Sequence, residues 1–186
     1  MAKLSYPRSG SLQFWPRKRA KKFLPSANWG AISKNGGKGL LGFIGYKVGM
    51  TSAYVKDSTQ NSMTKDKRII IPVSIVECPP MRIFSVRFYK NGIVKTEVVS
   101  NVAEKEMKRK LKLPKKYEKK IEDVRDFDDV RIIAYSLVKN TGQKKTPDIA
   151  EIAIGGNLDE KVNFVKEHLN KDLRIELFGH ELVDIR

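Results

Sequence analysis

A series of strand-length segments is the feature that most constrains the fold of this chain. Residues 81–99, MRIFSVRFYKNGIVKTEVV, alternate apolar and polar side chains on both sides of Asn91-Gly92, a dipeptide typical of tight β-hairpin turns. The segment 68–77, RIIIPVSIVE, is rich in β-branched residues and predicts a strand. Within it, Pro72 indicates an edge or bulge position, because proline cannot donate to a central ladder.

Further strands are predicted on both sides of this region. Residues 39–57, GLLGFIGYKVGMTSAYVKD, predict two strands joined by a tight turn near Gly49. The segments 129–139 and 149–156 predict two more, and the C-terminal stretch predicts a hairpin that turns near Gly179. Many short strands of this kind are typical of a small barrel or sandwich, so the predicted fold class is mainly β.

Two segments interrupt the β pattern with helical periodicity. Residues 102–125 hold 10 basic and 5 acidic residues, with Pro114 dividing two helical pieces. Residues 157–169 predict a second helix, with Asn157 as N-cap and Glu160 three residues later in the pattern of a capping box. Both are expected as helical insertions in the β domain.

The first 39 residues differ in composition from the rest of the chain. Prolines and glycines interrupt any helix or strand period, which predicts a long extended basic tail at 1–39 and a folded domain at 40–186. Removing 1–39 is therefore expected to leave a folded domain. Disordered segments are usually poor in aromatic residues, but this tail contains Tyr6, Phe14, Trp15, Phe23 and Trp29.

The charge distribution indicates a polyanionic partner. The formal net charge is +16, and residues 1–56 contain 11 basic residues and no acidic one, whereas the remaining chain has a net charge of only +5. Nucleic acid is the partner that such a charge favours, because binding to many phosphates releases counterions. A membrane surface is the rival partner, but the apolar stripe of 102–125 is too thin for a membrane-binding helix.

A tail with both cations and rings can order itself by stacking rings on bases while its cations meet phosphates. The alternative is that the rings dock on the protein's own domain. The charged segment 102–125 leaves two interpretations open as well: a solvated surface or a second RNA-contacting surface.

Catalytic chemistry finds little support in the sequence. His168 and His180 are the only histidines and have no metal-ligand spacing. The single cysteine, Cys78, is expected to be a small buried apolar residue in a reducing compartment. GGKGLLG lacks the G-x-x-x-x-G-K-[ST] spacing of a phosphate-binding loop. We therefore expect no enzyme activity, no cofactor and no metal.

Several motifs together resemble one protein family. The stretches GSLQFWPRKRA and GFIGYKVGMT resemble the large-subunit ribosomal protein three family, in its archaeal and eukaryotic branch. IVECPPM resembles a family segment in which threonine is common at the position of Cys78. EKVNFVKEHL and LVDI resemble the family's helix and the strand that follows it.

The resemblance implies a cytoplasmic component of the large ribosomal subunit that binds and positions ribosomal RNA and contacts neighbouring ribosomal proteins. It implies a partial β-barrel of the type found in several translation proteins, whose tail enters between RNA helices. Within the tail, Phe14 and Trp15 would stack on or wedge into folded RNA while the cations beside them neutralise phosphates. The expected RNA-binding residues are Arg8, Ser11, Phe14, Trp15, Arg17, Lys18, Arg19, Lys21, Lys22, Trp29, Lys34, Lys38, Lys47, Met50 and Thr51. A small basic DNA-compacting chromatin protein is the alternative function.

The sequence departs from the family pattern at its end. Family members continue after the LVDI-like strand into a long central loop and the remaining barrel strands, whereas the sequence stops at Arg186. Three explanations stay open: one half of a split family member, a reduced form, or a fragment of a longer product. Unpaired strand edges attract further strands, which favours a second polypeptide that supplies the remaining strands and the central loop.

Overall fold

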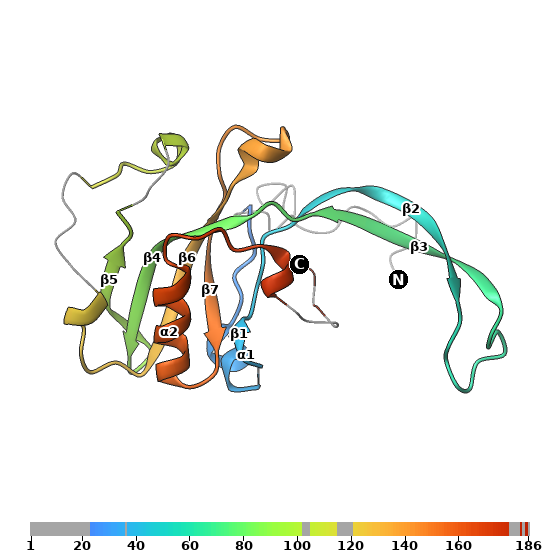
Figure 1. The fold of residues 1–186 in the computed structure, drawn as a ribbon, viewed down its shortest axis with the longest axis horizontal. Helices are drawn as coiled ribbons and strands as arrows, with labels where there is room; N and C mark the ends of the chain where they lie inside the picture. The colour runs from blue at the N-terminus through green and yellow to red at the C-terminus, as the bar shows by residue number, and fades with distance from the viewer. Residues whose placement is uncertain are drawn as a thin grey trace, which may run out of the picture.

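The computed structural model describes residues 23–35, 37–101, 105–114, 121–178, 183 and 185 (Figure 1). Its helices and strands are, in chain order, α1 (Trp29–Asn35), β1 (Gly39–Leu40), β2 (Tyr46–Lys56), β3 (Arg68–Glu77), β4 (Met81–Lys90), β5 (Ile93–Val99), the 3-10 helices η2 (Lys105–Arg109) and η3 (Ile121–Asp123), β6 (Asp129–Ser136), the 3-10 helix η4 (Val138–Thr141), β7 (Ile149–Gly155), α2 (Leu158–His168) and the 3-10 helix η5 (Ile175–Leu177).

Most of the strands form one antiparallel sheet in the order β1-β7-β6-β4-β5. The other two, β2 and β3, form a separate ribbon that extends away from the sheet (Figure 1). The mainly β fold class is thereby confirmed. Among the described strands the outer members β1 and β5 do not pair with each other, so closure into a barrel stays a prediction.

The sheet buries a core on each of its faces. On one face Val86, Ile132 and Ile152 pack with Val165 of α2, and Figure 1 shows this helix in front of the strands. Side chains alternate between the faces of a strand, so Ile133 points to the opposite side, where it packs in a second cluster with Met107. The η2 segment is therefore a lid on the face that α2 leaves uncovered.

The hairpin and the long helix form where the sequence predicts them. Asn91 and Gly92 join β4 to β5 with φ values of 52° and 77°, the left-handed conformations that a type I′ turn requires. At the start of α2, the Asn157 side chain accepts from the backbone of Glu160, and the Glu160 carboxylate accepts from the backbone of Asn157. This capping box is confirmed.

A half-buried polar network occupies part of the sheet face that carries the second cluster. The Glu151 carboxylate accepts from the Tyr89 hydroxyl at 2.7 Å, from Arg87 at 2.9 Å and from Arg131 at 3.1 Å. Burial alone would raise the pKa of Glu151, but these three hydrogen bonds outweigh it and lower the pKa.

Three expected elements take a different form. Gly49 does not turn the chain but lies inside the continuous strand β2, where it pairs with Ile75. The register shifts between Lys47 and Gly49, so Val48 is the extra residue of a bulge that does not end the strand. In place of two helical pieces, the described parts of 102–125 contain only the short 3-10 helices η2 and η3. The conformation of residues 105–114 is set by one buried side chain, Met107, rather than by an apolar stripe along a helix. Residues 175–177 form η5 instead of a hairpin strand, and the predicted turn at Gly179 lies outside the described residues.

The end of the predicted tail also differs from an extended chain. Residues 29–35 form α1, and Trp29 and Leu24 pack against the first core cluster. The indole lies against Gly42, where an added Cβ would come within 2.7 Å of the ring. For this part of the tail, docking on the protein's own domain is the outcome, and the removal of 1–39 would therefore expose core.

Candidate nucleic-acid interface

The β2–β3 ribbon has no fully buried residue in either strand. Its strands pair from Tyr46 opposite Glu77 to Lys56 opposite Arg68, and Figure 1 shows the ribbon curving away from the sheet. Except for Tyr46 at its base, it contributes no residue to the two core clusters of the described chain. A lone two-stranded ribbon is marginally stable in water, so an element of this length indicates a partner.

One face of the ribbon carries exposed apolar side chains. Tyr54 is 79% exposed and lies directly opposite Ile70, which is 60% exposed. Two pairs further along the same face is Met50, which is 64% exposed. An exposed aromatic ring beside flat apolar groups is a surface on which a nucleic-acid base can stack.

Cations flank this apolar face. Among the residues that the structure describes, Lys47, Lys65, Lys67 and Arg68 have no ion-pair partner. Lys56 pairs with Asp66 at 3.0 Å, and both side chains are mostly exposed. The ribbon therefore presents unneutralised positive charge to its surroundings.

The one buried acid of the ribbon faces inward at its tip. The Asp57 carboxylate accepts hydrogen bonds from the Thr64 hydroxyl at 2.5 Å and from the Thr59 backbone at 2.9 Å. These hydrogen bonds hold the pKa of Asp57 well below its usual range, and the bond from Thr64 lowers it most. The carboxylate therefore keeps its negative charge, but residues 47–76 hold five basic and only two acidic residues, so the ribbon stays positive.

The structure places the expected RNA-binding residues in three groups. Those before residue 23 lie outside the described residues: Arg8, Ser11, Phe14, Trp15, Arg17, Lys18, Arg19, Lys21 and Lys22. Lys47, Met50 and Thr51 lie together, exposed, on β2. The remaining three, Trp29, Lys34 and Lys38, lie in or beside α1.

Two of the three residues in the α1 group make contacts within the protein. Trp29 packs on the core, and Lys38 donates to Glu160 at 2.6 Å. This hydrogen bond raises the pKa of Lys38 and lowers that of Glu160. The side chain of Lys34 lies outside the described residues.

Sequence reasoning missed part of the ribbon face. Tyr54, Ile70 and the cations Lys65, Lys67 and Arg68 were not among the expected contacts. Their signal was present: apart from Asp57 and Asp66, the stretch from the N-terminus to Val76 contains no acid. Only the pairing of Tyr54 with Ile70 shows that these residues share a surface.

Residues with reactive side chains form no catalytic arrangement in the described structure. His168 stacks on Phe164 with ring centroids 4.4 Å apart, and Cys78 is half-buried, with a thiol pKa raised by burial. In the described ranges no three His, Cys, Asp or Glu side chains gather in a way that could hold a metal ion. The same ranges contain no helix with the length and apolar character needed to cross a membrane.

Comparisons with known proteins agree with the motifs. Residues 1–185 match the family model described as Ribosomal protein L3. The chain is 40% identical over 187 residues to "Large ribosomal subunit protein uL3" of Methanobrevibacter smithii, covering 94% of this chain and 55% of that protein. The proteins of the same name from Methanocaldococcus jannaschii and Archaeoglobus fulgidus are 37% and 36% identical, and the matches cover 97% and 96% of this chain and 58% and 57% of those proteins. The chain thus spans about half the length of the curated relatives it matches.

Proposed function

The chain belongs to the ribosomal protein L3 family, and on that premise we propose that it is a structural, RNA-binding component of the large subunit of the cytoplasmic ribosome. Its partners are large-subunit ribosomal RNA and neighbouring ribosomal proteins. Its role is to position RNA during assembly and translation through charge neutralisation and stacking, without catalysis.

The observation that carries this proposal is the continuity of unneutralised charge from the leader, which we define as residues 1–22, onto the ribbon. The acid-free stretch runs from residue 1 to Lys56, the end of β2, and the described ribbon exposes four cations without ion pairs. Each phosphate contact made by such a cation releases counterions, which favours binding to a compact polyanion.

The leader and the ribbon divide the work in this proposal. In the leader, Phe14 and Trp15 stack on RNA while the basic residues that follow them neutralise converging phosphates. On the ribbon, Tyr54 and Ile70 form a platform flanked by Arg68. Recognition is of RNA shape, since phosphate contacts carry no base information.

The test is incorporation into ribosomal subunits. A tagged chain in which Arg17, Lys18, Arg19, Lys21 and Lys22 are all replaced by Gln is expressed beside the unmodified tagged chain, and large subunits are isolated by sedimentation. This neutralisation, unlike removal of 1–39, keeps Trp29 and the core intact. We expect incorporation to fall several-fold while thermal unfolding of the free protein is unchanged.

Two outcomes would contradict the proposal. Equal incorporation of both chains would remove the role given to the leader. Equal affinity of the free protein for duplex DNA and for folded large-subunit RNA would favour the chromatin-protein alternative.

We also propose that a second polypeptide supplies strands that pair with the ribbon. Support comes from its two edges, on which no strand of the described residues pairs, and from the apolar face opposite Tyr54, where Ala53 lies against Ile71. Free edges bind further strands readily, and edge pairing leaves the Tyr54 face open to RNA. Amine-specific cross-linking from Lys56 in purified large subunits should capture this polypeptide; cross-links to known ribosomal neighbours alone, with no added strand, would refute it.

A further inference from the structure

Outside the ribbon, two segments of the described residues that are distant in sequence build a second basic surface. Residues 108–112 contribute Lys108, Arg109, Lys110 and Lys112, and the loop after η4 contributes Lys144 and Lys145. The guanidinium of Arg109 donates to the backbone carbonyl of Lys145 at 3.1 Å, which joins the two segments. We call these six residues the η2–η4 surface, and Figure 1 shows both segments above the same end of the sheet.

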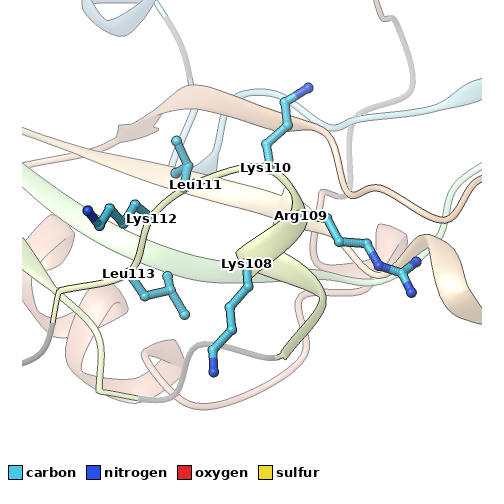
Figure 2. Close-up of a pocket in the computed structure, with 6 residues that line it drawn as sticks. All are labelled: Lys108, Arg109, Lys110, Leu111, Lys112 and Leu113. Carbon is cyan, nitrogen blue, oxygen red and sulfur yellow. The ribbon is translucent and has the colours of Figure 1, made fainter.

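A buried anchor fixes the first of these segments. Met107 is fully buried against Phe84 and Tyr135, and its carbonyl accepts from the backbone of Lys110 at 2.9 Å and of Leu111 at 2.8 Å. The chain is thus folded into a tight turn whose apolar residue points into the sheet and whose basic residues point out. Figure 2 shows these basic side chains fanning out in different directions from the turn.

Little of this charge is neutralised within the protein. The acid nearest to the surface is Asp148, which is buried and accepts from Lys144 at 2.6 Å and from the Tyr46 hydroxyl at 2.7 Å. Lys110 lies 4.0 Å from the same carboxylate. In the described residues Lys108, Lys112 and Lys145 have no ion-pair partner.

The start of the described chain lies beside this surface. Phe23 is the first described residue, and the ammonium of Lys144 lies 4.1 Å from the centroid of its ring, within the range of a cation–π contact. Because Lys21 and Lys22 directly precede Phe23, the basic run of the leader is covalently attached at the edge of the η2–η4 surface.

We infer that the η2–η4 surface is a second RNA-binding site, which holds the phosphate backbone of large-subunit ribosomal RNA next to the point where the leader leaves the domain. This inference rests on the proposed function and adds RNA contacts for residues outside the leader and the ribbon. A shallow, open hollow lined by residues 108–113 lies within the first of the two segments.

Two features favour RNA over an acidic protein segment as the occupant. The side chains diverge from one turn (Figure 2), so they suit phosphates of converging RNA strands better than one extended acidic peptide. The surface also offers few apolar groups: Leu111 and Leu113 lie among the basic side chains, while Met107 is turned inward. Protein interfaces usually need an apolar centre, whereas phosphate contacts do not.

The test compares two triple variants of the full chain with equal loss of charge. Lys108, Lys112 and Lys145 are replaced by Gln in the site variant. Lys166, Lys171 and Arg174 are replaced by Gln in the control, which lies on or just after α2 on the other face of the sheet and has no ion-pair partner in the described residues. Affinity for large-subunit RNA is measured as a function of salt concentration, beside an unrelated RNA of the same length.

The loss of three phosphate contacts should make the negative slope of log Kobs against log salt shallower by about two to three in the site variant. In the control the slope should stay close to that of the unmodified chain. Equal slopes for the two variants would overturn the site, and in that case an acidic protein neighbour becomes the occupant to seek. If the unmodified chain itself prefers large-subunit RNA no more than the unrelated RNA, the proposed function fails instead. Thermal unfolding of both variants should match that of the unmodified chain, because all six side chains are exposed.

Discussion

Replacement of Met107 by alanine tests how the η2 segment is held. Met107 is fully buried in the second core cluster, and truncation of a buried methionine costs about 2–5 kcal/mol of unfolding free energy. Here the covering layer is a short segment that can move toward the sheet and partly close the cavity. The lower part of that range, about 2–3 kcal/mol, is therefore expected.

The assay is urea and thermal unfolding of the purified chain, followed by circular dichroism. A cost of about 2–3 kcal/mol corresponds to a fall in Tm of about 4–12 °C for a chain of this size. The m-value in urea should not change, because the same surface is exposed on unfolding.

Leu111→Ala is the matched control. Leu111 lies four residues away on the same turn but is 39% exposed, so its truncation should change stability by no more than about 0.5 kcal/mol. Equal effects of the two substitutions would refute the conclusion that one buried side chain anchors the segment, and would favour a solvated helix.

Three further predictions concern the core, the polar network and the leader. Gly155→Ala should destabilise the chain by more than about 3 kcal/mol, since the added Cβ would meet the carbonyl oxygen of Gly37 at 1.7 Å. In the control Gly49→Ala the added Cβ would meet nothing within 4 Å, so the free energy of unfolding should change by no more than about 1 kcal/mol in the same assay. Similar effects of the two substitutions would contradict the packing of β1 on β7. Because the folded-state pKa of Glu151 is lowered, its contribution to stability is present above the unfolded pKa of about 4.3 and is lost as pH falls through the folded pKa; Glu151→Gln should flatten this part of the stability profile, and an unchanged profile would exclude the network as its source. Trp15→Ala should weaken RNA association by about 1–3 kcal/mol if a base stacks on the indole, while an effect near zero in the binding assay would indicate docking on the protein's own surface.

Local signals in the sequence were sufficient where an element is determined by its own residues. The Asn91-Gly92 turn and the strand 68–77 formed as predicted, and so did the α2 capping box. In each case the backbone conformation follows from a glycine, a cap or a β-branched run, and the packing around it agrees. Pro72 also lies on an edge strand, because β3 pairs only with β2 among the described strands.

Elements determined by distant contacts could not be predicted in this way. Gly49 favours a turn, but it pairs with Ile75 of β3, and the strand continues through it next to a bulge at Val48. The η2 segment has the charge of a solvated helix, but Met107 holds it to a sheet whose strand order brings together residues far apart in the chain. For the same reason the link between Arg109 and Lys145 has no signature in the sequence.

The sequence predicts the kind of site, a surface for a polyanion, but only some of the residues that are exposed on the candidate surface. The acid-free start of the chain indicates a polyanionic partner and led to Lys47 and Met50, both exposed on the ribbon. Trp29 has the same composition signal but packs on the core instead. Composition thus predicts a partner class, while burial decides which rings are exposed to a partner.

The most direct measurement of the central claim is sedimentation of a gentle cell lysate at low ionic strength, with this chain detected across the gradient before and after ribonuclease treatment. If unneutralised cations of the leader and the ribbon bind ribosomal RNA, the chain sediments with the large subunit and moves to the top of the gradient once the RNA is degraded. A chain that sediments as a free protein in the untreated lysate would contradict the account.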